Sequence, residues 1–264
     1  MAMEQTTPGA VALVGAGEYT DAMNMTDAWL LQTLGGPTVA RVALLPTASG
    51  LEANSPTMWN EMGQRHFAAL GVQDIRSTWI LNRDGASDPK QLDLLSGANF
   101  FYLSGGNPQH TIDSLRDTPA WEIMRAAYAQ GAVLAGCSAG AMAMSGYTIS
   151  LRQVMAGVIT GGPQDWAPAL GIVPRVVVFP HFDRMPRMLS QPTLQRLIKG
   201  APAGRVMLGV DERTALVRIT LPQQDGAEGE AGQARWRVMG EQTVSVFTSN
   251  AEAQVLRVGD ELTL

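Results

Sequence analysis

Short apolar segments alternate with amphipathic ones through the first two-thirds of the chain. The apolar runs predict five buried strands, at 11–14, 39–45, 75–81, 99–103 and 133–136. Helical spacing between them predicts helices over 27–34, 55–70, 90–95 and 113–130. Apolar strands that alternate with helices are typical of a parallel sheet covered on both faces. The pattern therefore predicts an α/β fold with a mostly parallel sheet.

The pattern changes in the last third of the chain. A further apolar strand is expected over 175–179 and a helix over 192–199. Short strand-like runs then follow at 206–210, 215–220, 236–239, 244–247 and 255–258, interrupted by a stretch rich in Gly, Glu and Ala over 223–233. We expect an α/β core over residues 1–205 and a C-terminal extension of β-hairpins over 206–264, packed on the same domain.

Composition narrows the class of protein. The chain of 264 residues has a net charge of −5 and no dense Lys/Arg cluster, which argues against a nucleic-acid partner. Its single cysteine cannot form an internal disulfide. The polar first nine residues, with Glu4, do not resemble a signal peptide, and no apolar run approaches the ~20 residues that cross a bilayer. We expect a cytoplasmic protein that does not bind a membrane.

The strand at 133–136 leads directly into Gly136-Cys137-Ser138-Ala139-Gly140. Glycines on both sides of Ser138 permit a backbone turn too tight for larger residues, and such a turn presents a serine hydroxyl at the carboxyl edge of the sheet. N–H groups at the start of the following helix can stabilise negative charge beside it. The motif predicts an activated nucleophile. Cys137 alternates with Ser138 and is expected to face the packed sheet.

A serine nucleophile needs a base, and the chain has three histidines. His66 lies in a helical segment beside Phe67 and is expected to be structural, whereas His110 could cap a helix or line a pocket. His181 follows the apolar strand at 175–179, so it should lie at the same sheet edge as Ser138. His181 is the favoured base, with His110 as the alternative.

Two further loops could complete the chemistry. The N–H of Ala139 is one expected oxyanion donor, and the loop Ser104-Gly105-Gly106-Asn107 is the expected source of the second. Glu18 is interpreted as an acid at a helix start. Asp211 and Glu212, which have no nearby His or Cys, are interpreted as a turn at the end of a strand, and no metal or cofactor is expected.

Three segments together resemble the peptidase E and cyanophycinase family of serine peptidases: Gly136-Cys137-Ser138-Ala139-Gly140-Ala141, Leu103-Ser104-Gly105-Gly106-Asn107 and Phe179-Pro180-His181-Phe182. The resemblance implies a fold like the class I glutamine amidotransferases, with Ser138 as nucleophile and His181 as general base. It also implies an oxyanion hole formed by Gly106 and Ala139, and cleavage beside aspartyl residues, in N-terminal Asp-X or β-Asp-linked dipeptides.

The chain departs from the family pattern in two places. Phe179-Pro180 stands where the cyanophycinase branch usually has Asp-Gln, which puts a preference for cyanophycin in doubt. The family also implies an acid a short distance after the serine, yet residues 146–164 contain neither Asp nor Glu. We therefore expect Gln153 or Asp165 to orient His181, and slow turnover.

An aspartyl substrate carries a carboxylate, which arginine binds as a fork. Arg184 and Arg187, just after His181, are the best-placed cations, and Arg152 is a third. Asn107 and Gln109 are also expected to contact a small peptide substrate. The family resemblance makes a homodimer an expectation.

Two other functions stay open. One is an esterase or amidase that uses the same nucleophile, although α/β-hydrolases usually carry their histidine much later in the chain. The other is a family member without activity, or with weak activity, that binds a small ligand.

Overall fold

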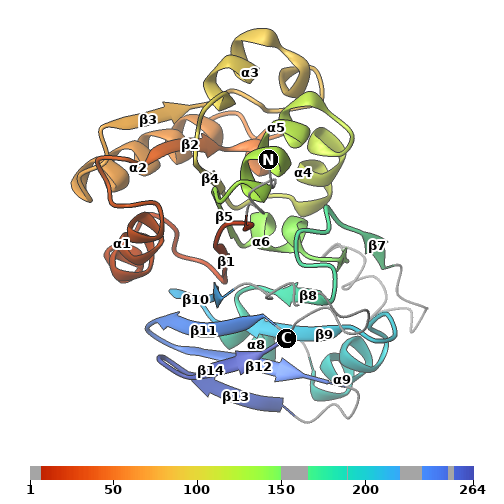
Figure 1. The fold of residues 1–264 in the computed structure, drawn as a ribbon. Coiled ribbons are helices and arrows are strands. Elements are labelled where there is room, and N and C mark those ends of the chain that lie inside the picture. Colours follow the sequence, from red (N-terminus) through yellow and green to blue (C-terminus); the bar gives the residue numbers. More distant parts are fainter. Residues whose placement is uncertain (1–6, 150–165, 189, 221–233, 249–252) are drawn as a thin grey trace, which may run out of the picture.

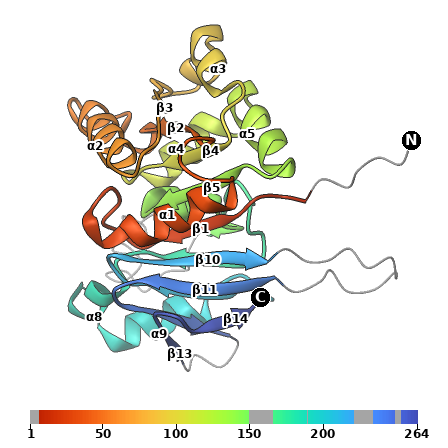
Figure 2. The same cartoon turned by 60° about the vertical axis from the view of Figure 1, so that its left-hand side comes forward.

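The computed structural model describes residues 7–149, 166–188, 190–220, 234–248 and 253–264. Its centre is an eight-stranded sheet (Figures 1 and 2). The strands, in spatial order, are β14 (Glu261–Thr263), β11 (Arg235–Gly240), β10 (Thr214–Thr220), β1 (Val11–Val14), β5 (Val133–Cys137), β4 (Phe100–Leu103), β2 (Arg41–Leu45) and β3 (Asp74–Ser77). Strands β1, β5, β4, β2 and β3 are parallel to one another. Strands β10, β11 and β14 extend this sheet by antiparallel pairing, beginning with β10 beside β1.

Helices cover both faces of the parallel part of the sheet. Helices α1 (Asn24–Thr33) and α2 (Ser55–Ala69) pack on one face. The other face carries α3 (Pro89–Leu95), α4 (Pro108–Leu115), α5 (Pro119–Ala129) and α6 (Ala139–Met144). Alternation within β4 shows why both faces are apolar: Phe100 and Tyr102 enter one core cluster, and Phe101 and Leu103 enter the other. The predicted α/β fold with a mostly parallel sheet is confirmed.

A second sheet lies beside the first, in the order β13 (Ala253–Arg257), β12 (Thr243–Phe247), β9 (Val206–Val210) and β8 (Val176–Phe179). Strands β8 and β9 are parallel. One side of this pair, including Val178 and Leu208, joins the core of the main sheet. The other side packs on α9 (Gln191–Lys199). A two-stranded sheet pairs β6 (Tyr147–Thr148) with β7 (Ala167–Pro168), and α8 (Met185–Met188) is a short helix. The described residues also form four 3₁₀ helices: η1 (Asp21–Met23), η2 (Thr47–Ser49), η3 (Gly85–Ser87) and η4 (Phe182–Arg184).

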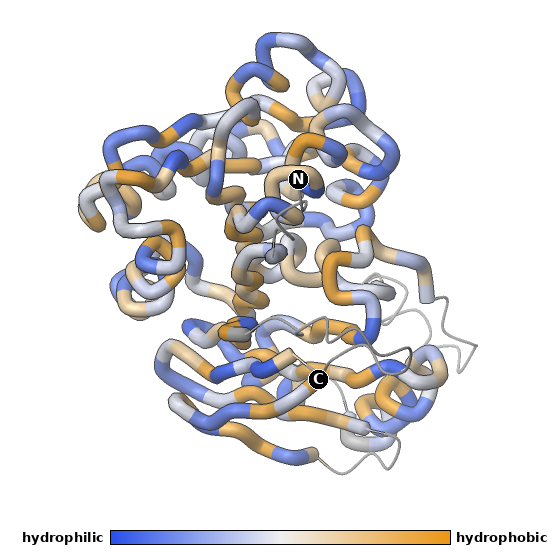
Figure 3. Tube along the Cα trace, viewed as in Figure 1, coloured by the Kyte–Doolittle hydropathy of each residue, from blue (hydrophilic) through white to orange (hydrophobic). Residues whose placement is uncertain are grey.

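The change in pattern after residue 205 marks a change of secondary structure along the chain. In space, each of the two larger sheets contains strands from both sides of that position. Figure 3 shows the result: hydrophobic segments gather in the central strands, and hydrophilic segments lie at the outer turns. The C-terminal strands thus extend the core of the α/β unit.

Local turns interrupt or shorten two of the predicted elements. The helix expected over 113–130 is divided into α4 and α5, because Asp117 has a φ of 55° and Pro119 restricts the residue before it to an extended backbone. Thr118 caps the new helix by accepting from the Trp121 N–H. The strand expected over 75–81 ends at Ser77, after which Thr78 bonds the Leu44 carbonyl and the chain turns away.

Helix α6 lies unusually close to the sheet because glycines remove side chains from the contact. A Cβ on Gly140 would stand 2.3 Å from the Leu103 carbonyl oxygen, and a Cβ on Gly136 would stand 2.6 Å from the Gly140 carbonyl carbon. Both obstacles are backbone atoms that cannot rotate away. This contact fixes the start of α6 against the ends of β4 and β5, where Ser138 lies.

We predict that Gly140→Ala lowers the free energy of unfolding by about 1–3 kcal/mol, because the new methyl group overpacks a backbone contact. Urea denaturation measures the change. Glu122→Ala is the control: the side chain is exposed and its ion pair with Arg125 lies at the surface, so we expect a change below about 0.5 kcal/mol. Equal stability of the two variants would contradict the packing argument.

Candidate active site

Ser138 occupies a strained turn between β5 and α6. Its φ of 50° and ψ of −108° lie outside the regions that L-residues usually adopt. Such conformations persist where the surrounding structure imposes them, and they concentrate at functional sites. The turn directs the Ser138 side chain away from the sheet, whereas the preceding Cys137 is fully buried in the core, as the alternation predicted.

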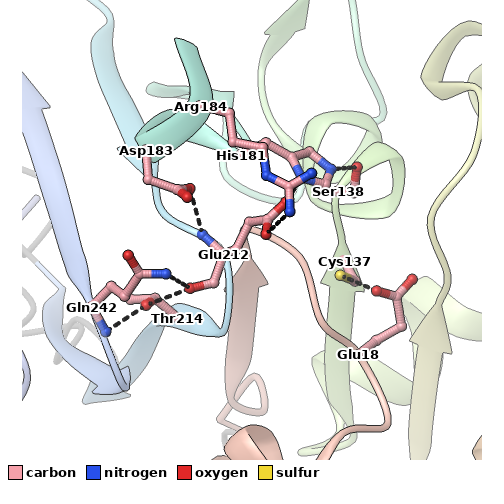
Figure 4. Close-up of polar contacts among 9 residues, drawn as sticks. All are labelled: Glu18, Cys137, Ser138, His181, Asp183, Arg184, Glu212, Thr214 and Gln242. Atoms are coloured by element: carbon pink, nitrogen blue, oxygen red, sulfur yellow. Dashed lines mark hydrogen bonds and ion pairs between the residues drawn. The ribbon is translucent and has the colours of Figure 1, made fainter. Parts of the chain in front are cut away.

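His181 meets Ser138 from the second sheet. It follows β8 and has a left-handed backbone, with φ 51° and ψ 37°. Its Nε2 lies 3.1 Å from Ser138 Oγ (Figure 4). The structure therefore brings together the two residues that the sequence predicts as nucleophile and base. His110 Nε2 instead lies 2.8 Å from the Leu81 carbonyl oxygen, and His66 lies 2.8 Å from Asp27 in the core.

Glu212 holds the other ring nitrogen of His181. Its Oε1 lies 2.7 Å from His181 Nδ1, and its Oε2 accepts from Arg184 at 2.5 Å (Figure 4). The ionised carboxylate only accepts, so Nδ1 carries the proton and Nε2 is free to accept from the Ser138 hydroxyl. The Glu212 backbone is fixed as well: its N–H donates to Asp183, and its carbonyl accepts from Gln242.

Glu212 is a partner of His181 that the sequence did not predict. Gln153 and Asp165, the residues expected to orient His181, lie outside the described residues. The sequence predicts only a structural turn at 211–212. The Glu212 carboxylate nevertheless contacts Nδ1 of His181, the role expected of Gln153 or Asp165. The contact follows from tertiary structure: β8 and β9 are adjacent parallel strands, and Phe179 pairs with Gly209. The residues just beyond the two strands must therefore meet.

The loop after β4 forms the opposite wall of the site. Gly106 has a φ of 143°, and a Cβ there would stand 2.4 Å from the Ala48 carbonyl oxygen, so glycine is required. Ala139 is the first residue of α6, and the N–H of a first helical residue has no acceptor within its helix. Gly106 and Ala139 both line the cavity beside Ser138. This position is consistent with their predicted role as oxyanion donors, which stays a prediction.

A cavity of about 340 Å³ opens at the nucleophile. It is lined by Gly106, Pro108, Ser138, Ala139, Met142, Ile149, Phe179, Pro180, His181, Arg184 and Met185. Of the residues expected to bind substrate, Arg184 belongs to this wall. Arg187, Asn107 and Gln109 do not line it: Arg187 is exposed on α8, Asn107 caps α4 by accepting from the His110 N–H, and Gln109 donates to Asp113.

Two general properties concern cofactors and membranes. Among the described residues, no group of three or more His, Cys, Asp or Glu side chains is arranged to hold a metal ion. In the same part of the chain, every helix is too short or too polar to cross a bilayer.

The fold and the site together define an α/β protein with the serine, histidine and carboxylate arrangement of nucleophilic hydrolases. The chain belongs to peptidase family S51, whose family model matches residues 11–220. The resemblance found in the sequence is thereby confirmed.

The chain is also similar in sequence to proteins named cyanophycinase. The chain is 30% identical to a cyanophycinase of Geminocystis herdmanii over 191 residues, which are 69% of this chain and 64% of that protein. It is 29% identical to a cyanophycinase of Trichormus variabilis over 228 residues, which are 82% of this chain and 70% of that protein. The chain thus spans about two-thirds of the length of these relatives.

Solved structures show the same fold. A peptidase from an acI-B1 actinobacterium is 26% identical, with a TM-score of 0.80 and complete coverage of both chains. A putative peptidase E protein from Listeria monocytogenes is 20% identical, with a TM-score of 0.57, covering 80% of this chain and 94% of that one.

Cys137 is predicted to be unreactive in the native protein. Burial and the neighbouring Glu18 carboxylate raise the pKa of its thiol well above the usual value, so the reactive thiolate is absent at neutral pH. Ellman's reagent should detect no fast-reacting thiol in the folded protein and one thiol after unfolding in guanidinium chloride. Rapid reaction of the folded protein would contradict this arrangement.

Replacing Glu212 by Gln should slow the reaction of Ser138 with a fluorophosphonate probe by about 10³–10⁴-fold, because an amide cannot stabilise the imidazolium that forms. The rate is measured by mass spectrometry of the intact protein. Glu241→Gln is the matched control, since this carboxylate pairs with Arg213 outside the site. A larger loss in Gln153→Ala or Asp165→Ala than in Glu212→Gln would assign the orienting role to one of those residues instead.

Proposed function

We propose that this protein is a serine peptidase that cleaves small aspartyl peptides through an acyl-enzyme on Ser138. The observation that carries the proposal is the continuous hydrogen-bonded line from Ser138 Oγ through His181 to Glu212. A serine hydroxyl is a weak nucleophile by itself, and this line supplies both a base and a group that stabilises the resulting cation.

The reaction would proceed in two halves. His181 Nε2 takes the hydroxyl proton as Ser138 Oγ attacks the scissile carbonyl, and the same proton then passes to the leaving amine. Water next attacks the acyl-enzyme, with His181 again as base. In both halves the tetrahedral oxyanion would lie between the N–H groups of Gly106 and Ala139, at the start of α6.

The geometry supports an enzyme over a family member that only binds a ligand. That alternative rested on the loss of the family's acid, and Glu212 supplies a carboxylate at the required ring nitrogen. An esterase would use the same residues, so the substrate decides between the two activities.

Arg184 supports an aspartyl substrate. It lines the cavity, its side chain is 60% exposed, and one of its nitrogens is bonded to Glu212. A guanidinium group has five N–H donors, so the bond to Glu212 leaves others for a substrate carboxylate. The family resemblance, which implies cleavage beside aspartyl residues, and the relatives named cyanophycinase also support this proposal.

A dipeptide panel tests the substrate class. We expect peptides with Asp in the first position, α- or β-linked, to be cleaved with a kcat/KM at least about 10-fold above that of Asn, Glu or Ala peptides, since charge-assisted hydrogen bonds contribute about 1.5–3 kcal/mol. Ser138→Ala should abolish cleavage. An esterase would instead hydrolyse simple acyl esters without preferring any of these peptides.

Arg184→Gln should reduce the ratio of Asp to Asn activity by about 10–100-fold, the loss of one charge-assisted contact. Any disturbance of Glu212 falls on both substrates equally, so the ratio isolates recognition. Arg187→Gln is the comparison on the exposed α8. If Arg187→Gln alone lowers the ratio, the substrate carboxylate binds there and not at Arg184.

A further inference from the structure

Glu18 is a buried carboxylate that reaches two walls of the site. It follows β1 and is 5% exposed. Its Oε2 accepts from Cys137 Sγ at 2.8 Å (Figure 4). Its Oε1 accepts from the Gly105 N–H at 2.9 Å. The sequence interpretation of a simple acid at a helix start does not account for this position, because neither partner belongs to the next helix.

The two partners belong to the two elements that would form the oxyanion hole. Cys137 directly precedes the nucleophile, and Gly105 directly precedes Gly106. Burying a carboxylate is costly unless hydrogen bonds satisfy it. Here a main-chain N–H and a thiol each satisfy one oxygen. The raised pKa of the Cys137 thiol keeps it protonated and therefore able to donate.

In the loop after β4, one main-chain N–H group has no hydrogen-bond acceptor among the described residues. The Ser104 N–H donates to the Leu45 carbonyl, the Gly105 N–H to Glu18, and the Asn107 N–H to the Ala48 carbonyl. Among the described residues, the Gly106 N–H has no acceptor, and Gly106 lines the cavity beside Ser138. The hydrogen bonds on either side fix the peptide planes that determine where this N–H points.

We propose that Glu18 is a positioning residue for the oxyanion hole: it ties the Gly105 peptide to the nucleophile strand, so that the Gly106 and Ala139 N–H groups converge on one oxygen. This inference rests on the proposed serine chemistry but not on the choice of substrate. Glu18 does not touch the substrate. It sets the distance between two elements that contribute one donor each.

The test compares Glu18→Leu, which removes the acceptor, with Glu18→Gln, whose side-chain oxygen can still accept from Gly105. Loss of one oxyanion donor costs about 10²–10³-fold in rate. We expect Glu18→Leu to slow fluorophosphonate labelling of Ser138 by about that factor, and Glu18→Gln to stay within about 10-fold of wild type. For cleaved peptides the loss should fall on kcat, with KM little changed.

Asp27→Leu is the matched control, because Asp27 is a fully buried acid that pairs with His66 away from the site. Thermal unfolding shows whether each variant is folded. If Asp27→Leu and Glu18→Leu lose stability alike but only Glu18→Leu loses labelling, the effect is positional. A folded Glu18→Leu protein that labels at the wild-type rate overturns the proposal.

Hydrogen exchange of the wild-type protein gives a second test that needs no variant to fold. The Gly105 amide should exchange at least about 100-fold more slowly than the Gly106 amide, and equal exchange of the two would contradict the proposed tie. Labelling without cleavage of any aspartyl peptide would refute the proposed substrate alone. No labelling of the wild-type protein would refute the serine chemistry and this inference with it.

Discussion

The site depends on the parallel pairing of β8 with β9. Phe179 lies opposite Gly209 in this pair, and both strands end within a few residues of that point. Because the two strands run side by side in the same direction, His181 and Glu212, which follow them, lie next to each other and form a hydrogen bond of 2.7 Å. An antiparallel pair would place the two strand ends at opposite edges of the sheet.

The nucleophile comes from a different sheet, so the two sheets must be held in a fixed relation. Residues of β8 and β9 pack into the same apolar cluster as Leu134 of the nucleophile strand. Protein interiors of this kind are densely packed and resist sliding. The 3.1 Å contact between Ser138 and His181 is therefore set by the burial of apolar side chains behind it.

Backbone constraints hold the nucleophile from its own side. Gly136 and Gly140 let α6 approach the sheet, and the strained Ser138 turn lies directly between them. Glu212 is also constrained, since Asp183 accepts from its backbone N–H and Arg184 binds its second oxygen. Arg184 and His181 each bond one oxygen of Glu212, and both line the cavity beside Ser138.

Much of this arrangement could be predicted from local sequence. Apolar runs of strand length predicted the parallel sheet. The Gly-x-Ser-x-Gly turn and the position of His181 after an apolar strand predicted two side chains that the structure places in contact. The sheet and this proximity could be predicted because each depends on residues that are neighbours in the chain. Where a helix or strand boundary was wrong, as at Pro119 and Ser77, a local turn ended the element earlier than the apolar pattern did.

The tertiary structure alone decided which groups meet across the fold. Glu212 and Glu18 are ordinary acids at turns in the sequence, and no local pattern separates them from the carboxylates on the surface. Their contacts come from which strands become neighbours: β9 beside β8 for Glu212, and β1 beside β5 for Glu18. Strand order is set by burial of the whole core, so the partners of these two carboxylates are properties of the folded chain.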